Sequence, residues 1–510
     1  MTKSSQNRLF GKGAGRICGV AAAPTAREMA RLVRGAMRDT PTIELRLDWL
    51  RSDAERAKFL DWLKRSKPRA TFVATCRREE GGGNLRGSVD AELRWLARAR
   101  DAGCLWCDLE VETYSNLKRA ALRELGLPPH VMLSLHDFKR TPAHLAVPRT
   151  ARHGFNAVKI AAKARTIRDS ARVLRFARRA KNIVAVPMDE IGLPARILAL
   201  REGSQLAYAP MGQATAPGQV SLQDFKHLYR AHELTSRTRV YGVIGDPIGH
   251  SLSPLLHNSG FVARGTDAVY LPFLVKDLRD FLSAIRDFGV RGFSVTIPHK
   301  QALLDHLDEC EPLAADIGAV NTVVVRRDGS LLGCNTDYLG VLRSLEKRMA
   351  LRGSRVLIFG AGGSARAAAF ALAKAGAAVS ICARREAAAR ELALAAGGEA
   401  VPRRALRRLR FDAILNATPV GMYPHEHACP LLPSELNCHV VMDFIYRPRK
   451  TQLLKMAAQK GITTVSGLEM FLAQGFAQWE IWMNRRAPEA AMRRAVLDHL
   501  REEEKAGLRH

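Results

Sequence analysis

The stretch NAVKIAA (156–162) is the most informative one in the first half of the chain, because it places one charge inside an apolar run. Lysine rarely enters a protein interior unpaired, since burial disfavours its ammonium form. A desolvated Lys159 would carry a nucleophilic amine, which can form an imine with a ketone. The alternative is a lysine at a strand end that reaches back to water, and the heptamer alone favours it. The surrounding sequence therefore has to decide.

Similar apolar runs recur between residues 16 and 210, and each is followed by a stretch with helical periodicity. Examples of the helical stretches are TAREMARLVRGAMR (25–38) and SVDAELRWLARARDAG (88–103). Eight such βα units are typical of a TIM barrel, (β/α)8, with an open doubly wound sheet as the alternative. The eight runs begin near residues 16, 42, 70, 104, 130, 156, 182 and 204.

A TIM barrel carries its chemistry at the C-terminal ends of its strands, and polar residues collect there in this chain. Lys159 lies within the sixth run and His136 ends the fifth. A protonated imine is an electron sink, and a nearby histidine can remove the adjacent proton as a general base. We expect Glu44 to orient or charge-tune the histidine, and arginines to clamp a substrate carboxylate. The remaining polar residues of this rim are Arg46, Arg77, Arg196, Thr215 and Gln219.

Four motifs of the first half resemble type I 3-dehydroquinate dehydratase over nearly all of 16–230. They are ELRLD (44–48), LSLHDF (133–138), AVKIA (157–161) and ATAPGQ (214–219). The resemblance implies Lys159 as the imine former and His136 as the acid/base for loss of water from 3-dehydroquinate. It also implies substrate-binding or supporting roles for Glu44, Arg46, Arg77, Arg196, Thr215 and Gln219. In ATCRREEGG (74–82) the arginine-to-glutamate interval is one residue shorter than in the family pattern, at Glu80.

A second α/β pattern begins at RVYGVIGDP (239–247). Farther on, Lys300 lies at a strand end in FSVTIPHK (293–300), and Asp337 follows in GCNTDYLG (333–340). A lysine beside an aspartate can hand a proton to a developing alkoxide. In GVIGDPIGHSLSP (242–254), Ser251 and Ser253 offer hydroxyls to a carboxylate, and the alternative role of Ser253 is to cap the helix that starts at Pro254.

A dinucleotide-binding pattern occurs at VLIFGAGGSAR (356–366), where Gly360, Gly362 and Ala365 follow a strand and open a helix. The glycines permit a tight turn and close approach of a pyrophosphate to the helix N-terminus. About 20 residues later, an NAD site would have an acidic residue for the ribose. The chain has Arg384 and Arg385 there. Arginine suits a 2′-phosphate, which predicts NADP, although two solvated arginines are the alternative.

The second half resembles shikimate dehydrogenase over nearly all of 240–485. SLSP, VTIPHK, AVNT, NTD, GAGGSAR, NATPVGM (416–422) and GLEMFLAQ (467–474) occur in the family's order. The resemblance implies Lys300 and Asp337 as the catalytic pair. It implies contacts to shikimate or 3-dehydroshikimate from Ser251, Ser253, Thr296, Asn321, Tyr446 and Gln474. It implies an NADP site formed by Gly360, Ala361, Gly362, Gly363, Ser364, Ala365, Arg384, Arg385, Thr418, Gly467 and Met470.

Both resemblances together imply a fused enzyme of aromatic amino-acid biosynthesis. It would dehydrate 3-dehydroquinate and then reduce 3-dehydroshikimate to shikimate with NADPH, and neither mechanism requires a metal. One alternative is a quinate/shikimate dehydrogenase working catabolically with NAD. Another is a basic nucleic-acid-binding protein on a degenerate enzyme scaffold. The expected segments are a disordered tail (1–15), the dehydratase barrel (16–232), a linker (233–239), a substrate-binding domain (240–340, completed by about 466–486), a Rossmann-type NADP-binding domain (341–465) and a charged C-terminal helix (487–510).

Composition limits the possible partners and the cellular location of the protein. The 510 residues carry a formal net charge of +29, but the arginines are spread along helical segments such as 168–181 and aromatic residues make up only 6%. This pattern favours solvated helix faces over a nucleic-acid-binding module. Nine cysteines at scattered positions, including Cys104 and Cys107, indicate free thiols in a reducing compartment. No apolar run reaches the ~18–20 residues of a membrane span. We expect a cytoplasmic protein, and a homodimer is compatible with the sequence.

Overall fold

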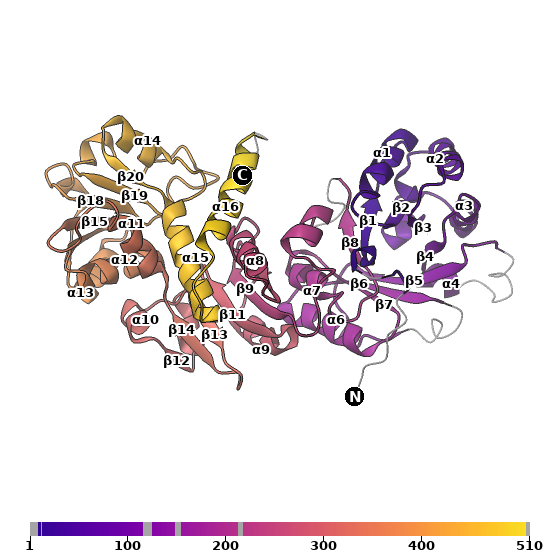
Figure 1. Ribbon diagram of the computed structural model, residues 1–510, viewed down its shortest axis with the longest axis horizontal. Coiled ribbons are helices and arrows are strands. Elements are labelled where there is room, and N and C mark those ends of the chain that lie inside the picture. Colours follow the sequence, from indigo (N-terminus) through magenta and orange to yellow (C-terminus); the bar gives the residue numbers. More distant parts are fainter. Residues whose placement is uncertain (1–8, 12, 116–124, 148–154, 213–217, 506–510) are drawn as a thin grey trace. The chain divides into compact units, whose positions relative to one another are not determined.

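The computed structural model describes residues 9–11, 13–115, 125–147, 155–212 and 218–505 (Figure 1). The chain divides into two compact units, residues 1–239 with 271–289, and residues 240–270 with 290–510. Within the described ranges, no helix is long and apolar enough to cross a membrane.

The first unit contains an eight-stranded parallel sheet in the order β7-β6-β5-β4-β3-β2-β1-β8. Next to the seam between β7 and β8, the Gln205 amide donates to the Ile183 carbonyl at 2.7 Å, so the barrel is nearly closed. Each of the eight apolar runs forms one strand, which confirms the predicted barrel. The strands are β1 (Ile17–Ala21), β2 (Thr42–Arg46), β3 (Thr71–Thr75), β4 (Trp106–Glu110), β5 (His130–Asp137), β6 (Ala157–Lys163), β7 (Ile183–Met188) and β8 (Ala207–Pro210).

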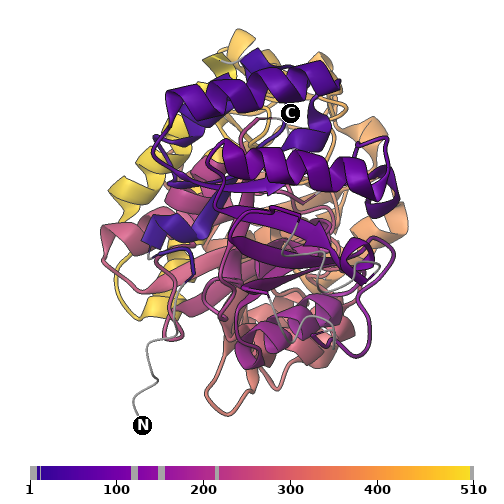
Figure 2. The same ribbon diagram turned by 90° about the vertical axis from the view of Figure 1, so that its right-hand side faces the viewer.

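Helices follow the strands and lie outside them, as the indigo and violet ribbons of Figure 2 show. Several begin at a side-chain cap that satisfies a free backbone N–H of the first turn. The Thr25 hydroxyl accepts from the Glu28 amide, and Thr166 forms a reciprocal capping box with Asp169. The described helices of this barrel are α1 (Ala26–Ala36), α2 (Asp53–Ser66), α3 (Val89–Asp101), α4 (Val111–Ser115), α6 (Ile167–Arg179) and α7 (Leu193–Leu198).

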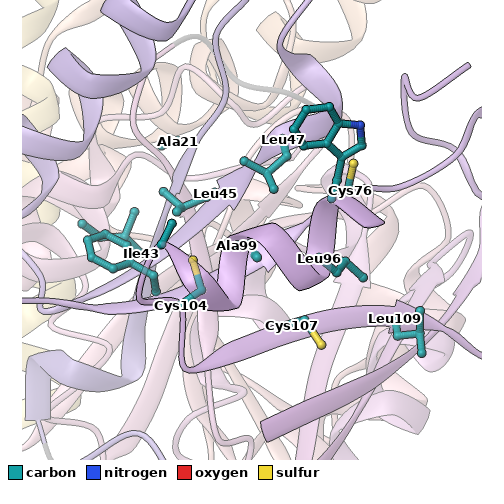
Figure 3. Packing of buried hydrophobic residues seen from close by; sticks show 14 of the residues in the cluster. Ala21, Ile43, Leu45, Leu47, Cys76, Leu96, Ala99, Cys104, Cys107 and Leu109 are labelled. Carbon is teal, nitrogen blue, oxygen red and sulfur yellow. The ribbon is translucent and has the colours of Figure 1, made fainter. Parts of the chain in front are cut away.

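Alternating residues of each barrel strand face opposite sides, and this alternation places the functional side chains. Outward positions such as Ile43, Leu45, Cys107 and Leu109 pack against the helices in one apolar cluster (Figure 3). The positions between them face the barrel interior, because successive strand side chains point to opposite faces. The same outer cluster holds Cys104, whose thiol is free and buried like that of Cys107. Both cysteines therefore serve packing.

The N-terminal end of the barrel interior is closed by an apolar side chain from before β1. Phe10 is 6% exposed, and its ring lies 4.3 Å from that of Trp106. The preceding Leu9 amide donates to Gln205 Oε1 at 3.2 Å. This packing differs from the disordered tail expected over 1–15, of which residues 1–8 and 12 lie outside the described residues.

A mixed six-stranded sheet follows, in the order β10-β9-β11-β13-β14-β12. Strand β9 starts at Arg239, so the last residue of the expected linker already belongs to this sheet. The strands are β9 (Arg239–Gly245), β10 (Ala268–Leu274), β11 (Val290–Val295), β12 (Glu309–Cys310), β13 (Thr322–Val325) and β14 (Leu331–Cys334). The accompanying helices are α8 (Ser253–Ala263), α9 (Leu278–Phe288) and α10 (Pro312–Ile317).

The third sheet is parallel throughout and has the order β17-β16-β15-β18-β19-β20, the doubly wound order 3-2-1-4-5-6 of dinucleotide-binding folds. Leu357 and Ile358 of β15 belong to different apolar clusters, so both faces of the sheet are covered. The strands are β15 (Arg355–Phe359), β16 (Ala378–Cys382), β17 (Glu399–Ala400), β18 (Ala413–Asn416), β19 (Val440–Asp443) and β20 (Thr463–Val465). The helices are α11 (Asp337–Leu345), α12 (Gly363–Lys374), α13 (Glu386–Ala395), α14 (Gln452–Gln459), α15 (Gly467–Met483) and α16 (Glu489–Lys505).

Candidate active sites

The inward positions of five neighbouring barrel strands carry polar and charged side chains toward their C-terminal ends. Apolar residues such as Val73 and Met132 fill the interior closer to the N-terminal ends. The polar set contains residues singled out from the sequence and four that were missed, Thr75, Asp108, Glu110 and Ser134. The set comprises Glu44 and Arg46 from β2, Thr75 of β3 and Arg77 just beyond it, Asp108 and Glu110 from β4, Ser134 and His136 from β5, and Lys159 from β6.

Lys159 is 4% exposed, and its ammonium forms an ion pair with Oδ2 of the buried Asp108. The other Asp108 oxygen accepts from the Ser134 hydroxyl at 2.6 Å. Burial alone would raise the pKa of Asp108, but Lys159, Arg77 and His136 together hold it below its ordinary value. The Tyr208 ring lies 5.0 Å from Lys159 Nζ on another side. Lys159 is therefore an interior lysine with a fixed orientation, and the alternative of a strand-end lysine in water is wrong.

His136 is oriented by Glu110, whose Oε2 lies 3.0 Å from His136 Nδ1. Arg77 Nε donates to the other oxygen of Glu110 at 2.6 Å. Burial would raise the pKa of Glu110, but its bonds to His136 and Arg77 lower it, so Glu110 is a carboxylate and accepts a hydrogen bond from His136 Nδ1–H. Burial and Arg77 lower the pKa of His136 to about 4, against the opposing effect of Glu110. His136 is thus a neutral imidazole at pH 7 with its Nε2 lone pair available.

The expected orienting role of Glu44 is wrong. Its Oε1 accepts from the Thr75 hydroxyl at 2.7 Å, whereas Glu110 holds the histidine. The carboxylates of β4 were missed because 104–112 reads as a packing strand. Their signal in the sequence is the alternation of Asp108 and Glu110 with Cys107 and Leu109 at the end of a barrel strand.

The other residues expected at this rim differ in their surroundings. Arg46 donates to both oxygens of Asp48, at 2.9 and 2.7 Å. Arg196 donates to the carbonyls of Pro187 and Gly218, and burial lowers the pKa of Arg196 to about 10. Gln219 is half-buried, and Thr215 lies outside the described residues. Glu80 is exposed and pairs with Arg78, which also pairs with the buried Glu92.

A second charged pair lies in the other unit. Lys300 Nζ donates to Asp337 Oδ2 at 2.5 Å and to the Ser364 hydroxyl at 3.3 Å. Asn321 Nδ2 donates to the other Asp337 oxygen at 2.7 Å and lies 3.5 Å from Gln474 Oε1. These residues lie in the turn after β11, the loop before β13, the start of α11, and helices α12 and α15. The structure therefore brings together five residues that are far apart in the sequence.

The remaining residues expected to bind the substrate of this unit differ in burial. The Ser251 hydroxyl accepts from the Ser253 amide at 3.2 Å, and Ser253 is hydrogen-bonded to Tyr270. The capping alternative for Ser253 is wrong, because α8 starts at Ser253 and its N-cap position, Leu252, has no side-chain bond. Thr296 is half-buried directly after β11. The Tyr446 ring stacks on that of Phe471 at 4.9 Å.

The glycine turn after β15 fits a dinucleotide pyrophosphate. Gly360 has φ +124°, and a Cβ there would lie 2.9 Å from the Ala417 carbonyl oxygen. A Cβ at Gly362 would meet nothing within 4 Å, and no side chain caps α12. The turn thus leaves open space beside helix N–H groups that lack partners within the helix. Arg384 and Arg385 follow β16 and are exposed.

The other residues of the expected cofactor site lie in the loop after β18 and at the start of α15. The Thr418 hydroxyl donates to Asn416 Oδ1 at 2.7 Å, in the loop after β18. A Cβ at Gly467 would lie 2.4 Å from the Phe444 carbonyl oxygen, so only glycine fits there. Met470 packs on Gly340 of α11.

The fold and site of the first unit define a barrel equipped for lysine imine chemistry with a histidine base. The fold and site of the second unit define a two-lobed, dinucleotide-dependent oxidoreductase. Comparison with known proteins agrees: the family described as Type I 3-dehydroquinase matches residues 17–236. The Shikimate dehydrogenase substrate binding domain matches residues 243–323, and the Shikimate 5'-dehydrogenase C-terminal domain matches residues 467–497.

Individual relatives cover one or both halves. The Bifunctional 3-dehydroquinate dehydratase/shikimate dehydrogenase, chloroplastic, of Arabidopsis thaliana is 34% identical over 475 residues, which cover 88% of this chain and 78% of that protein. The Shikimate dehydrogenase (NADP(+)) of Methanothermobacter thermautotrophicus is 41% identical over 278 residues, 52% of this chain and 97% of that protein. A crystal structure of shikimate dehydrogenase from Aquifex aeolicus has 34% identity and a TM-score of 0.49, and covers 52% of this chain and 99% of that chain.

The chain belongs to the family of bifunctional 3-dehydroquinate dehydratase/shikimate dehydrogenases. It is an enzyme with a lyase domain and an oxidoreductase domain.

Proposed function

We propose that this protein converts 3-dehydroquinate to 3-dehydroshikimate in its barrel and reduces that product to shikimate in its second half with NADPH. The observation that supports the first reaction is the interior pair of Lys159 with Asp108 beside a neutral histidine. The observation that supports the second is the contact of Lys300 with both Asp337 and Ser364 of the dinucleotide turn. The relatives that match the second half carry NADP(+) in their names.

In the barrel, the Lys159 ammonium first passes a proton to Asp108, and the resulting amine attacks the substrate ketone. That proton and one from the amine leave with the ketone oxygen as water, which restores the Asp108 carboxylate and forms a protonated imine. The Asp108 carboxylate pairs with the Lys159 ammonium when no substrate is bound, and it then stabilises the positive charge on the imine nitrogen. His136 Nε2 removes a proton from the carbon next to the imine, and the imine takes up the electron pair. His136 then returns that proton to the departing hydroxyl, which leaves as water. Hydrolysis of the imine frees Lys159 and the enone.

The surrounding residues hold the reacting groups. Glu110 keeps His136 in the tautomer with its proton on Nδ1. Arg77 contacts Asp108 and Glu110 inside the barrel, at 3.4 and 2.6 Å, and together with Lys159 it balances their two charges. We propose Glu44, Arg46, Arg196, Thr215 and Gln219 as substrate-binding or supporting residues.

In the second half, bound NADPH supplies the hydride. Lys300 gives a proton to the oxygen of the reduced ketone, and Asp337 holds the lysine ammonium in place. Asn321 fixes Asp337 from the opposite side. We propose that Ser251, Ser253, Thr296, Tyr446 and Gln474 bind the substrate.

We propose that residues 360–365 hold the NADP pyrophosphate, and that Arg384 and Arg385 bind the 2′-phosphate. Thr418, Gly467 and Met470 would lie at the nicotinamide end. The segment boundaries expected from the sequence, 16–232, 240–340 with 466–486, and 341–465, stand as the proposed limits of the catalytic domains.

The deciding experiment supplies 3-dehydroquinate with NADPH and follows enone absorbance and cofactor loss together. Lys159→Ala should abolish enone formation and leave shikimate oxidation intact, whereas Lys300→Ala should do the reverse. Dehydration by Lys159→Ala at the parental rate would refute the imine mechanism. Rates with NAD and quinate in place of NADP and shikimate test the catabolic alternative.

We further propose a cytoplasmic protein, because all nine cysteines are free thiols. The Arabidopsis relative is chloroplastic by name, so fractionation of the source cells tests the location. A homodimer is proposed as the assembly to test by light scattering, and the absence of salt-sensitive DNA binding tests the enzyme assignment against a nucleic-acid-binding protein.

A further inference from the structure

Arg447 joins three segments of the second unit that no residue assigned so far connects. It belongs to the loop between β19 and α14. Its Nη1 donates to the His250 carbonyl at 3.0 Å. Its Nη2 donates to both carboxylate oxygens of Glu503 on α16, at 2.8 and 2.9 Å. The side chains of Arg447 and Glu503 are only 16% and 17% exposed, so their pairing is largely shielded from water.

Each of the three segments carries or supports a group proposed to bind the substrate. His250 directly precedes Ser251, whose hydroxyl accepts a hydrogen bond from the Ser253 amide at the start of α8. Tyr446 directly precedes Arg447 and stacks on Phe471. One guanidinium therefore fixes the loop that contains Ser251 (the serine loop) relative to the loop that contains Tyr446 (the tyrosine loop).

The C-terminal helix supplies the third segment, and its packing explains why Glu503 is in place. Met492, Val496 and Leu500 form the buried side of α16. At Gly260 of α8, a Cβ would lie 3.0 Å from the Met492 sulfur, so the two helices touch closely. Figure 1 shows α16 running beside α8. The helix anchored on α8 thus presents Glu503 to the loop that follows β19.

The loop is also held from its own side. Asp443, which is fully buried at the end of β19, accepts from Asn416 Nδ2 at 3.0 Å and from the Thr451 hydroxyl at 2.6 Å. Both ends of the segment 443–451 are therefore fixed, and Arg447 is the residue through which it reaches the serine loop.

We propose that Arg447 is a positioning residue for the dehydrogenase reaction, and that Glu503 of the C-terminal helix holds its guanidinium in place. This inference rests on the proposed dehydrogenase function. Arg447 keeps Ser251 and Tyr446 in one arrangement before the substrate arrives, which reduces the ordering cost of binding. A lysine should replace it poorly, because the guanidinium presents two separate nitrogens to the carbonyl and the carboxylate in a fixed plane, whereas an ammonium has a single nitrogen on a flexible stem.

The test measures shikimate oxidation with saturating NADP+ for the full-length wild type and for Arg447→Gln, Arg447→Lys and Glu503→Gln. We expect Arg447→Gln to raise the KM for shikimate about tenfold, with kcat changed less than about threefold. Arg447→Lys should raise KM nearly as much, and Glu503→Gln should raise it less. Dehydration by the barrel should be unchanged in every variant.

Arg449→Gln is the matched control, because Arg449 pairs with Glu504 at the next position of the same helix, and both side chains are far more exposed. Its KM should equal that of the wild type. A role in stability alone would lower the active fraction, and hence kcat, without raising KM. If Arg447→Gln fails to fold, the KM of Glu503→Gln decides between these roles.

A wild-type KM in Arg447→Gln, or full rescue by Arg447→Lys, would overturn the inference while the proposed function stands. A wild-type protein that does not oxidise shikimate would instead refute the proposed function.

Discussion

Replacing Glu110 by glutamine should slow dehydration without preventing imine formation. The glutamine amide nitrogen has to face either Arg77 Nε, 2.6 Å from one carboxylate oxygen, or His136 Nδ1, 3.0 Å from the other. In the first arrangement two donors meet. In the second the amide donates to Nδ1, which moves the imidazole proton to Nε2 and removes the lone pair that acts as base. The first arrangement loses the bond from Arg77, and the second keeps that bond but reverses the direction of the bond to His136.

The magnitude follows from the loss of a positioned general base. Such a base contributes about 10²–10⁴ in rate, and imidazoles in the correct tautomer remain a minority population of the variant. We expect kcat of dehydration to fall about 10²–10³-fold, which corresponds to about 3–4 kcal/mol in the activation free energy. The pH profile should change as well, because Glu110 raises the pKa of His136. Without this carboxylate the pKa of His136 falls, so the acid limb of kcat/KM moves to lower pH.

The assay follows enone absorbance from 3-dehydroquinate from about pH 3 to pH 8, so that it includes the acid limb set by the pKa of about 4 of His136. Borohydride added with substrate should still trap the substrate on Lys159, as seen by mass spectrometry. Glu112→Gln, an exposed glutamate two residues farther on, is the control and should retain parental kinetics. A kcat within threefold of the parent, or an acid limb that moves to higher pH, would refute the assignment of Glu110 as the residue that orients His136.

Three further changes test the second unit. Gly360→Ala should abolish NADP-dependent activity but leave dehydration intact, because the new Cβ would lie 2.9 Å from the Ala417 oxygen at φ +124°. A wild-type affinity for NADP+, measured by titration of the variant, would contradict this. Arg384→Ser should raise the KM for NADP+ about tenfold while leaving NAD+ kinetics unchanged, and an equal change for both nucleotides would exclude a contact to the 2′-phosphate. Burial raises the pKa of Asp443 from 3.8 to about 6, against its bonds from Thr451, Ile445 and Asn416. Its protonated form therefore favours folding below about pH 3.8, and about 3 kcal/mol of this contribution is lost as pH rises through 6. Asp443→Asn should remove that dependence, which thermal unfolding of both proteins between pH 4 and 7 would reveal as a difference in Tm that varies with pH.

The barrel strands could be predicted because each is a short apolar run followed by a helical pattern, and all eight runs become strands. Lys159 was identifiable as unusual since it interrupts such a run. The partners of Lys159 and His136 could not be assigned in the same way. Asp108 and Glu110 contact residues 51 and 26 positions away, at distances set by strand order and register.

Register also explains why Glu44 was misassigned. Glu44 and Glu110 both point into the barrel, and the sequence contains nothing that measures which carboxylate lies nearer to the histidine. The second half was easier to interpret, because Lys300, Asn321 and Asp337 each follow or begin a regular element. The contact of Arg447 with Glu503 spans 56 residues and depends on the helix packing at Gly260, which no local pattern reveals.

The ion pair of Lys159 with Asp108 has a consequence for how this barrel can change during evolution. Removing Lys159 alone leaves Asp108 and Glu110 to share the single charge of Arg77, and an unbalanced buried charge is destabilising. Replacing both Lys159 and Asp108 by apolar residues of similar volume is, by contrast, often neutral or stabilising. Loss of the lysine alone would therefore endanger the fold as well as the reaction. Descendants that abandon the dehydration step are expected to lose both charges together, and the free energy of unfolding of the resulting barrel should equal or exceed that of its catalytic ancestor.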